Sequence, residues 1–225
     1  MPLGAEDYAG ASSLLQLLGQ AAQAQAFSST GQPQTRFDID RLAWDSRQQA
    51  LVLQARVAHL PRHAWAHLLA MLQKNDDALE ELAQVHIVAA HAGPQDVVTV
   101  EALFAAVPQD WHTAEPGFPW EAPGVDKSRN LRLEMSFAGA PTAEQVQAVD
   151  DALGLWQQMN ILGAFDMDLG PADDLDPLGG VRQISPHTLV CSIPYFRGHI
   201  SGLVALLGIV QHIHRNLAIE EAVLD

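Results

Sequence analysis

The hydrophobic positions of this chain follow two periods, one of two residues and one of three to four. From Leu131 to Phe137 apolar and polar residues alternate, as in a strand with one buried face. Thr142 and Gln145 then form the signature of a capping box, which marks the start of a helix. That helix places four apolar residues on one face: Val146, Val149, Leu153 and Trp156. The pattern therefore predicts a strand followed by an amphipathic helix.

The same succession of strand and helix recurs at Leu51 to Leu72 and at Leu189 to Leu217. The first of these strands, 50–58, is the second arm of a predicted hairpin with 41–45. Pro61 opens the helix that follows, because a missing amide hydrogen costs nothing at the first helical position. The last helix carries a face of small residues that permits close approach by another element: Gly202, Ala205 and Gly208.

A first helix is predicted near the start of the chain, where Ser12 or Ser13 is a suitable cap and the following leucines and alanines recur at helical spacing. A short helix is expected at 78–83 and a short strand at 85–88, and 97–103 fits either a strand or a short helix. Trp65 and Trp156 both lie in helical apolar stripes, so we expect both side chains to be largely buried.

These units predict an α+β fold, with a mainly antiparallel sheet covered by amphipathic helices. No glycine-rich phosphate loop follows any predicted strand, which argues against a nucleotide-binding α/β fold. The N-terminal α+β region, 1–130, ends in a loop rich in proline and aromatic residues, from Pro108 to Arg129, and the C-terminal strand–helix units follow at 131–225. The two regions could be separate domains or one continuous domain.

The charge of the chain restricts its partners. In 225 residues there are 12 Lys and Arg against 27 Asp and Glu, for a net charge of −15. Such a field repels nucleic acid and anionic membranes and favours solubility or a basic protein partner. We expect a cytoplasmic protein, because the N-terminus lacks a signal-peptide pattern and the most apolar segment is too short to span a bilayer. The single cysteine, Cys191, lies in an apolar run and fits a buried strand residue.

Few residues have spacing that suggests chemistry. His63 and His67 are four apart on a predicted helix and His59 precedes them, so the three are the candidate metal ligands. No glutamate that could act as a base stands between the two helical histidines, and a solvated histidine face is the simpler interpretation. The acidic stretch 166–176 lacks the spacing of a calcium loop, and no serine lies in a nucleophile elbow. We therefore expect no cofactor and assign no catalytic residue.

Two predicted loops carry the candidate partner-binding residues. The first loop contributes aromatic side chains, which pack either on the protein's own core or on a partner. The second contributes carboxylates that would attract a basic polypeptide. The residues are Trp111, Phe118, Trp120, Asp166, Asp168, Asp173 and Asp174.

The order of elements over 14–159 resembles that of class I type III secretion chaperones. The residues that carry the resemblance are the Leu14-Leu15-Gln16-Leu17-Leu18 helix, the hairpin Leu42-Ala43-Trp44-Asp45 to Leu51-Val52-Leu53, the segments His59-Leu60-Pro61 and Leu68-Leu69-Ala70-Met71-Leu72-Gln73-Lys74-Asn75, the strand Leu131-Arg132-Leu133-Glu134 and Trp156. The resemblance implies a homodimer that binds unfolded segments of secreted proteins and neither binds a cofactor nor catalyses a reaction. Unlike those chaperones, this chain adds a long aromatic loop before Asn130 and a strand and helix after Gly179.

Three hypotheses about function follow. The first is a non-catalytic protein that binds another polypeptide, chaperone-like for a secreted or basic partner. The second is an immunity-type inhibitor whose negative surface neutralises a basic toxin. The third is an enzyme, or a protein that binds a small molecule or metal, using His59, His63 and His67.

Overall fold

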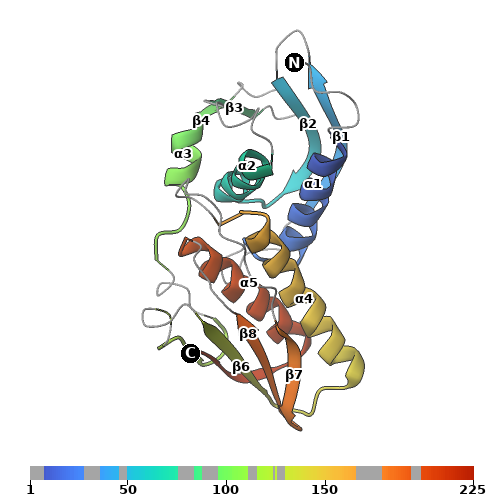
Figure 1. Cartoon of the computed structure of the whole chain (residues 1–225), viewed down its shortest axis with the longest axis vertical. Coiled ribbons are helices and arrows are strands. Elements are labelled where there is room, and N and C mark those ends of the chain that lie inside the picture. Colours follow the sequence, from blue (N-terminus) through green and yellow to red (C-terminus); the bar gives the residue numbers. More distant parts are fainter. Residues whose placement is uncertain are drawn as a thin grey trace.

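The computed structural model describes residues 8–27, 36–45, 50–75, 84–87, 96–110, 116–123, 125, 130–165, 179–193 and 199–225. Within them the chain has an α+β fold with a five-stranded, mostly antiparallel sheet at one end (Figure 1). The elements of that end are β5 (Trp120–Glu121), β6 (Leu131–Phe137), α4 (Ala143–Ile161), β7 (Gly179–Ser185), β8 (Thr188–Ile193), α5 (Ser201–Asn216) and β9 (Ile219–Leu224).

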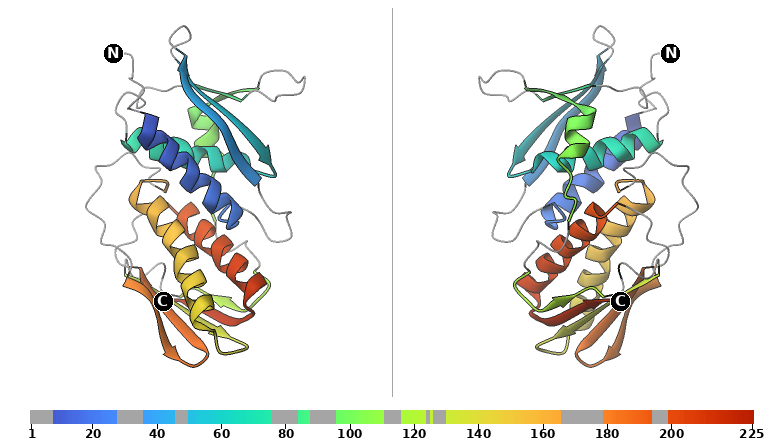
Figure 2. Two further views of the ribbon diagram at one scale, coloured as in Figure 1. Left: turned by 90° about the vertical axis from the view of Figure 1, so that its right-hand side faces the viewer. Right: turned by 90° about the vertical axis from the view of Figure 1, so that its left-hand side faces the viewer.

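From β6 to β9 the chain forms one βαββαβ unit. The strand order is β5-β9-β6-β8-β7, and every pairing among β6, β7, β8 and β9 is antiparallel. The last strand of the unit therefore lies beside the first, which is the ferredoxin-like, or split βαβ, topology. Helices α4 and α5 lie on the same face of the sheet (Figure 2). The short β5 joins the edge of β9 in parallel.

The clearest sequence patterns produce the elements that they predict. Along β6 the side chains at odd positions are buried and those between them are partly or fully exposed. The capping box is present: the Thr142 hydroxyl accepts the Gln145 amide at 3.3 Å, and the Gln145 side-chain oxygen accepts the Thr142 amide at 2.8 Å. Trp156 on the buried face of α4 is 1% exposed. Cys191 is a buried residue of β8, as expected.

The N-terminal elements are α1 (Tyr8–Gln23), β1 (Arg36–Asp45), β2 (Ala50–Ala58), α2 (Arg62–Asn75), β3 (Gln84–Ile87), β4 (Asp96–Thr99) and α3 (Val100–Ala105). The predicted hairpin is confirmed as the antiparallel pair β1–β2. The ambiguous stretch 97–103 is both a strand and a helix, because Thr99 ends β4 and caps α3.

Helix α2 does not extend the pattern of helices on the large sheet. The two hairpins form separate two-stranded sheets, and α2 packs against α1 and α3. The expectation that the helix after Pro61 covers the same sheet as α4 and α5 is therefore wrong. An isolated hairpin is marginally stable in water. The β1–β2 hairpin is supported by α1, which packs along β1.

Two strands were not anticipated. The stretch 163–186 was expected to be a loop, yet its end forms β7, which starts with Gly179 and Gly180 and shifts register twice against β8. Strand β9 has buried Ile219, Ala222 and Leu224, and a register shift against β6 breaks the alternation that would have identified it. The helix expected at 78–83 lies outside the described residues. Trp65 is only partly buried, packing at the rim of the core.

Buried side chains from both halves share one hydrophobic cluster, which includes Leu14 to Phe27 of the first helix and its turn, Met71, Leu133, Trp156 and Leu224. The N-terminal region and the βαββαβ unit therefore contribute to the same core. None of the described helices is long and apolar enough to cross a membrane.

The closest approach within this core is between the C-terminal turn of α1 and the middle of α5. A Cβ atom at Gly208 would collide with the carbonyl oxygen of Gln25 and come within 3.3 Å of the backbone of Ala26. One turn earlier on α5, the Gly202 carbonyl accepts the indole N–H of Trp156 at 2.7 Å. The small residues of α5 thus permit the close contact that their spacing predicts.

Removing the Trp156 side chain tests the packing of α4 on α5. Trp156→Ala should lower the free energy of unfolding by about 3–5 kcal/mol, since a large buried side chain is lost and a cavity remains. Trp156→Phe keeps most of the apolar volume but leaves the Gly202 carbonyl without its donor, and should cost about 1–3 kcal/mol. Urea denaturation measures both values. A Trp156→Phe protein as stable as the parent would contradict the hydrogen bond.

Two helical glycines form a matched pair that tests the approach of α1 to α5. Gly208→Ala should destabilise the protein because the new methyl group meets the rigid backbone of Gln25 and Ala26. Gly154→Ala in α4 meets nothing within 4 Å and should stabilise by about 0.5–1 kcal/mol, through the better helix propensity of alanine. Thermal unfolding distinguishes the two. A Gly208→Ala protein as stable as the parent would show that α1 does not contact α5 closely.

Candidate functional site

The residues expected to bind a partner fall into three groups. Trp111, Asp166, Asp168, Asp173 and Asp174 lie outside the described residues. Phe118 is buried in the core, with its ring 4.9 Å from that of His214. Trp120 is half-buried against the same core, and its buried indole N–H has no hydrogen-bond partner among the described residues. The aromatic side chains of this loop that the structure describes therefore pack on the protein itself.

The candidate metal ligands do not converge. His59 is exposed, with a positive φ of 58°, and precedes α2. The rings of His63 and His67 stand edge to face with centroids 6.1 Å apart. Within the described ranges, no three His, Cys, Asp or Glu side chains are placed to hold a metal ion. His63 and His67 nevertheless lie at the point where the two halves of the chain meet.

His67 is 1% exposed and is held by the C-terminal turn of α4. Its Nδ1 lies 2.8 Å from the carbonyl oxygen of Ala164. A carbonyl oxygen can only accept, so Nδ1 carries the hydrogen and the ring is the Nδ1–H tautomer. The ring stacks on Phe27, 5.3 Å away and tilted by 20°, and meets the edge of Phe165 at 5.3 Å.

The turns that supply these two phenylalanines have the same geometry. After α4, Gly163 has φ 84°, and the amides of Gly163 and Ala164 bond to the carbonyls of Asn160 and Met159. This is a Schellman motif. After α1, Gln25 has φ 64°, and the amides of Gln25 and Ala26 bond to the carbonyls of Ala22 and Ala21 in the same pattern. Each phenylalanine follows its left-handed residue by two positions.

A third histidine, His199, joins this region to the start of α5. Its backbone amide donates to the Phe165 carbonyl at 2.8 Å, and its Nδ1 lies 3.2 Å from the Ser201 amide, which donates to it. Its Nε2 lies 3.2 Å from the side-chain oxygen of Gln109. We call His63, His67, His199, Phe27 and Phe165 the histidine junction.

Burial in this junction keeps two of its histidines neutral. Burial lowers the pKa of His67 to about 3, opposed in part by the hydrogen bond with Ala164, and the charges of His63 and His199 lower it further. Burial likewise lowers the pKa of His63 to about 4, opposed in part by a hydrogen bond with the backbone of Phe27. Neutral imidazoles stacked on aromatic rings hold helices together and offer no obvious catalytic arrangement.

A different surface gathers charge. The face of the five-stranded sheet opposite α4 and α5 carries the side chains at the even positions of β6, together with their partners on β9. Four carboxylates share it: Glu121, Glu134, Glu221 and Asp225. Glu121 is placed there by its parallel register with Val223, and Asp225 by its two backbone hydrogen bonds with Arg132. We call these four residues the acidic sheet face.

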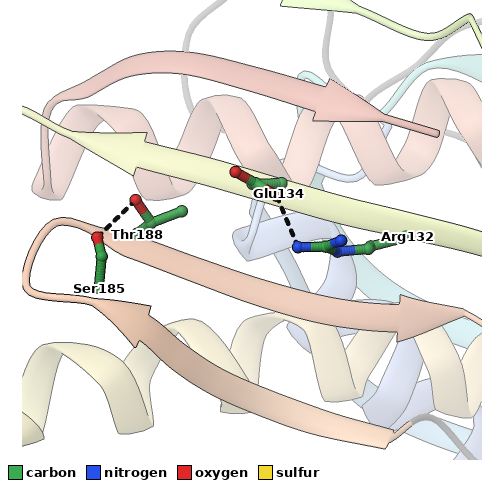
Figure 3. Close-up of polar contacts among 4 residues, drawn as sticks. All are labelled: Arg132, Glu134, Ser185 and Thr188. Carbon is green, nitrogen blue, oxygen red and sulfur yellow. Dashed lines mark hydrogen bonds and ion pairs between the residues drawn. The ribbon is translucent and has the colours of Figure 1, made fainter.

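Positive charge on the same face is sparse among the described residues. Arg132 forms an ion pair with Glu134 at 2.8 Å, although its side chain remains 54% exposed. Arg182 lies at the far edge on β7, opposite Val190. Figure 3 shows four of the polar side chains on this side of the sheet: Arg132, Glu134, Ser185 and Thr188. The part of the face over β5, β9 and β6 is therefore negative on balance.

Comparison with known proteins finds no match to this chain among protein-family models, curated proteins or solved structures.

Sequence reasoning missed both His199 and the acidic sheet face. His199 is far along the sequence from His63 and His67, with no motif that links it to them, and only the fold brings the three residues together. Glu221 and Asp225 could have been found from the alternation at the end of the chain, had the bulge at Glu220 not disturbed it. Glu121 shares their face through a two-residue pairing with no distinctive sequence signal.

Cys191 provides a chemical test of the core beneath this sheet. Burial, with a contribution from the charge of Asp150, raises the pKa of the thiol to about 12. We expect Cys191 to resist alkylation by iodoacetamide at pH 8 in the native protein and to react fully in urea, because the thiolate is the reactive form. Rapid labelling of the native protein would contradict the burial of β8.

Proposed function

We propose that this protein works without catalysis, by binding a basic polypeptide on its acidic sheet face. The observation that carries the proposal is the grouping of Glu121, Glu134, Glu221 and Asp225 on adjoining strands, with Arg132 as the cation among them. Three of the four carboxylates are exposed and the fourth is partly exposed, so they would meet a partner without any rearrangement of the fold.

The overall charge supports the same class of partner. A net charge of −15 attracts a basic protein from a distance and raises the rate of encounter. Helices α4 and α5 lie on the other face of the sheet. On this face the side chains of β6 and β9 are polar apart from Val223, while Val190 of β8, opposite Glu134, is buried. A polar, charged face with partly exposed neighbours such as Val223 has the mixed character of a protein-binding surface.

The succession of α1, the β1–β2 hairpin and α2 is compatible with the resemblance to class I type III secretion chaperones, which would make the partner a segment of a secreted protein. An immunity-type inhibitor of a basic toxin would use the same acidic surface. The identity of the bound protein separates these two forms of the proposal, since a secreted effector supports the first and a toxin the second.

Neutralising the face tests the proposal. The protein and the variant Glu121→Gln/Glu221→Gln/Asp225→Asn are each used to capture partners from an extract of the native host. We expect a basic protein to be recovered in stoichiometric amount with the parent and to be reduced at least tenfold with the variant. Recovery should also fall as salt rises from about 0.1 to about 0.5 M, because the Debye length shortens.

A matched control removes the same amount of charge elsewhere. The variant Glu101→Gln/Glu144→Gln/Asp151→Asn neutralises three exposed carboxylates of α3 and α4, away from the acidic sheet face, and should capture the partner as well as the parent does. Equal losses with both variants would attribute binding to net charge alone. Undiminished capture by the sheet-face variant, or the absence of any basic protein, would overturn the proposal.

A further inference from the structure

The histidine junction connects four segments that are distant in the sequence. His63 hydrogen-bonds with the backbone of the turn after α1, and His67 donates to the turn after α4. His199 ties the start of α5 to that second turn and, through Gln109, to the segment after α3. Imidazole rings thus supply the polar part of a contact between the N-terminal elements and the βαββαβ unit that is otherwise hydrophobic.

The surroundings of the junction penalise a positive charge. The side chains around His67 are Phe27, Phe165 and His63, and His199 is the other titratable group whose charge reaches it. Among the residues that the structure describes, the charged side chains beside the two turns are also cations. Lys74 of α2 lies against Gly163, and Arg215 of α5 donates to the side chain of Gln25. A proton added here would meet apolar rings and charges of its own sign.

We propose that the histidine junction is an acid-sensitive latch, which releases α2 from the turns after α1 and α4 while the βαββαβ unit stays folded. The device is independent of the proposed partner binding. Protonation of His67 adds a charge to a ring enclosed by Phe27 and Phe165, and that charge is hydrated only when α2 moves away. The strands of the βαββαβ unit contain none of the three junction histidines. In helix α5, burial and the charge of Arg215 lower the pKa of His212, but its side chain is partly exposed and can be hydrated without opening the fold.

The pH at which the latch opens follows from proton linkage. His63 and His67 are neutral in the closed state, and they regain an ordinary pKa near 6.5 once exposed. The closed state therefore has its full advantage above about pH 6.5 and loses it as the pH falls towards the closed-state values. Each histidine contributes about a tenfold change per pH unit in this window, so two together change the opening equilibrium about 100-fold per unit.

Hydrogen exchange on the full chain tests the latch. Protection factors, which remove the pH dependence of intrinsic exchange, are measured at pH 7, 6 and 5 for peptides from α2 and from β6 and β8. We expect protection in α2 to fall steeply between pH 6 and pH 5, by about 100-fold, while protection in β6 and β8 stays within a few fold. A parallel loss in all three elements would overturn local release in favour of global unfolding.

Two variants isolate the proton that matters. His67→Asn keeps an N–H close to the position of Nδ1 but cannot be protonated, so the fall in α2 protection should drop to about tenfold per pH unit. His187→Asn alters an exposed histidine in the turn between β7 and β8 and should leave the parent's pH dependence unchanged. An unchanged slope in a folded His67→Asn protein would overturn the proposal.

A measurement on the unaltered protein keeps the proposal testable if His67→Asn does not fold. The ¹⁵N shifts of the imidazole nitrogens report the protonation and tautomer of each ring. His67 should remain the neutral Nδ1–H tautomer at pH 5 in the closed state, with any protonated signal belonging to a separate open population. Titration of His67 in the folded protein with a pKa near 6.5 would overturn the latch.

Discussion

The contact on which the rest of the structure depends is the burial of one imidazole, that of His67, between two helix ends. A helix terminates with carbonyl groups that lack partners within the helix. At the end of α4 the Schellman turn satisfies two of them, and His67 donates to the carbonyl of Ala164 in the turn just beyond the helix. His63 likewise hydrogen-bonds with the backbone of Phe27 in the turn after α1. Helix α2 is thus held by the ends of its neighbours.

This arrangement constrains α1 and α5 in turn. The turn after α1 requires a left-handed residue, and the residue present is Gln25, which bears a Cβ and so adopts that conformation at a cost. Its position is supported from both sides: its carbonyl rests against Gly208 and its side chain accepts a hydrogen bond from Arg215. The conformation of one turn therefore depends on a glycine and an arginine more than 180 residues away. Packing of this kind couples the two halves of the chain.

The sequence allowed prediction where local pattern and tertiary burial agree. Strand β6 and helix α4 were predicted because alternation, capping and apolar spacing all indicate the same elements. The close approach at Gly208 was likewise visible as a face of small residues. Strands β7 and β9 were missed because bulges and glycines break the period of two that identifies a strand. Their pairing is decided by the sheet that they join and not by their own composition.

The contacts of His63 and His67 show a second reason why structure could not be predicted fully from the sequence. A spacing of four places His63 and His67 on one helix face, which fits metal ligands, exposed side chains or capping groups alike. Their partners are the backbone atoms of Phe27 and Ala164, and any residue type supplies a backbone carbonyl. No inspection of side-chain identity could have found this pairing. The acidic sheet face could not be predicted for the same reason, since its carboxylates come from three strands whose register is set by the tertiary structure.

The edges of the five-stranded sheet bear on how such a protein meets a partner. At one edge the amide of Val181 in β7 donates to the carboxylate of Asp150 at 2.8 Å, and register shifts interrupt the strand. At the other, β5 pairs with β9 and a bulge lies at Glu220. Both devices disfavour the addition of a further strand. Among the described residues, helices cover one face of the sheet and the acidic sheet face lies on the other, so the proposed recognition of a basic partner would use the face of the sheet and not its edges.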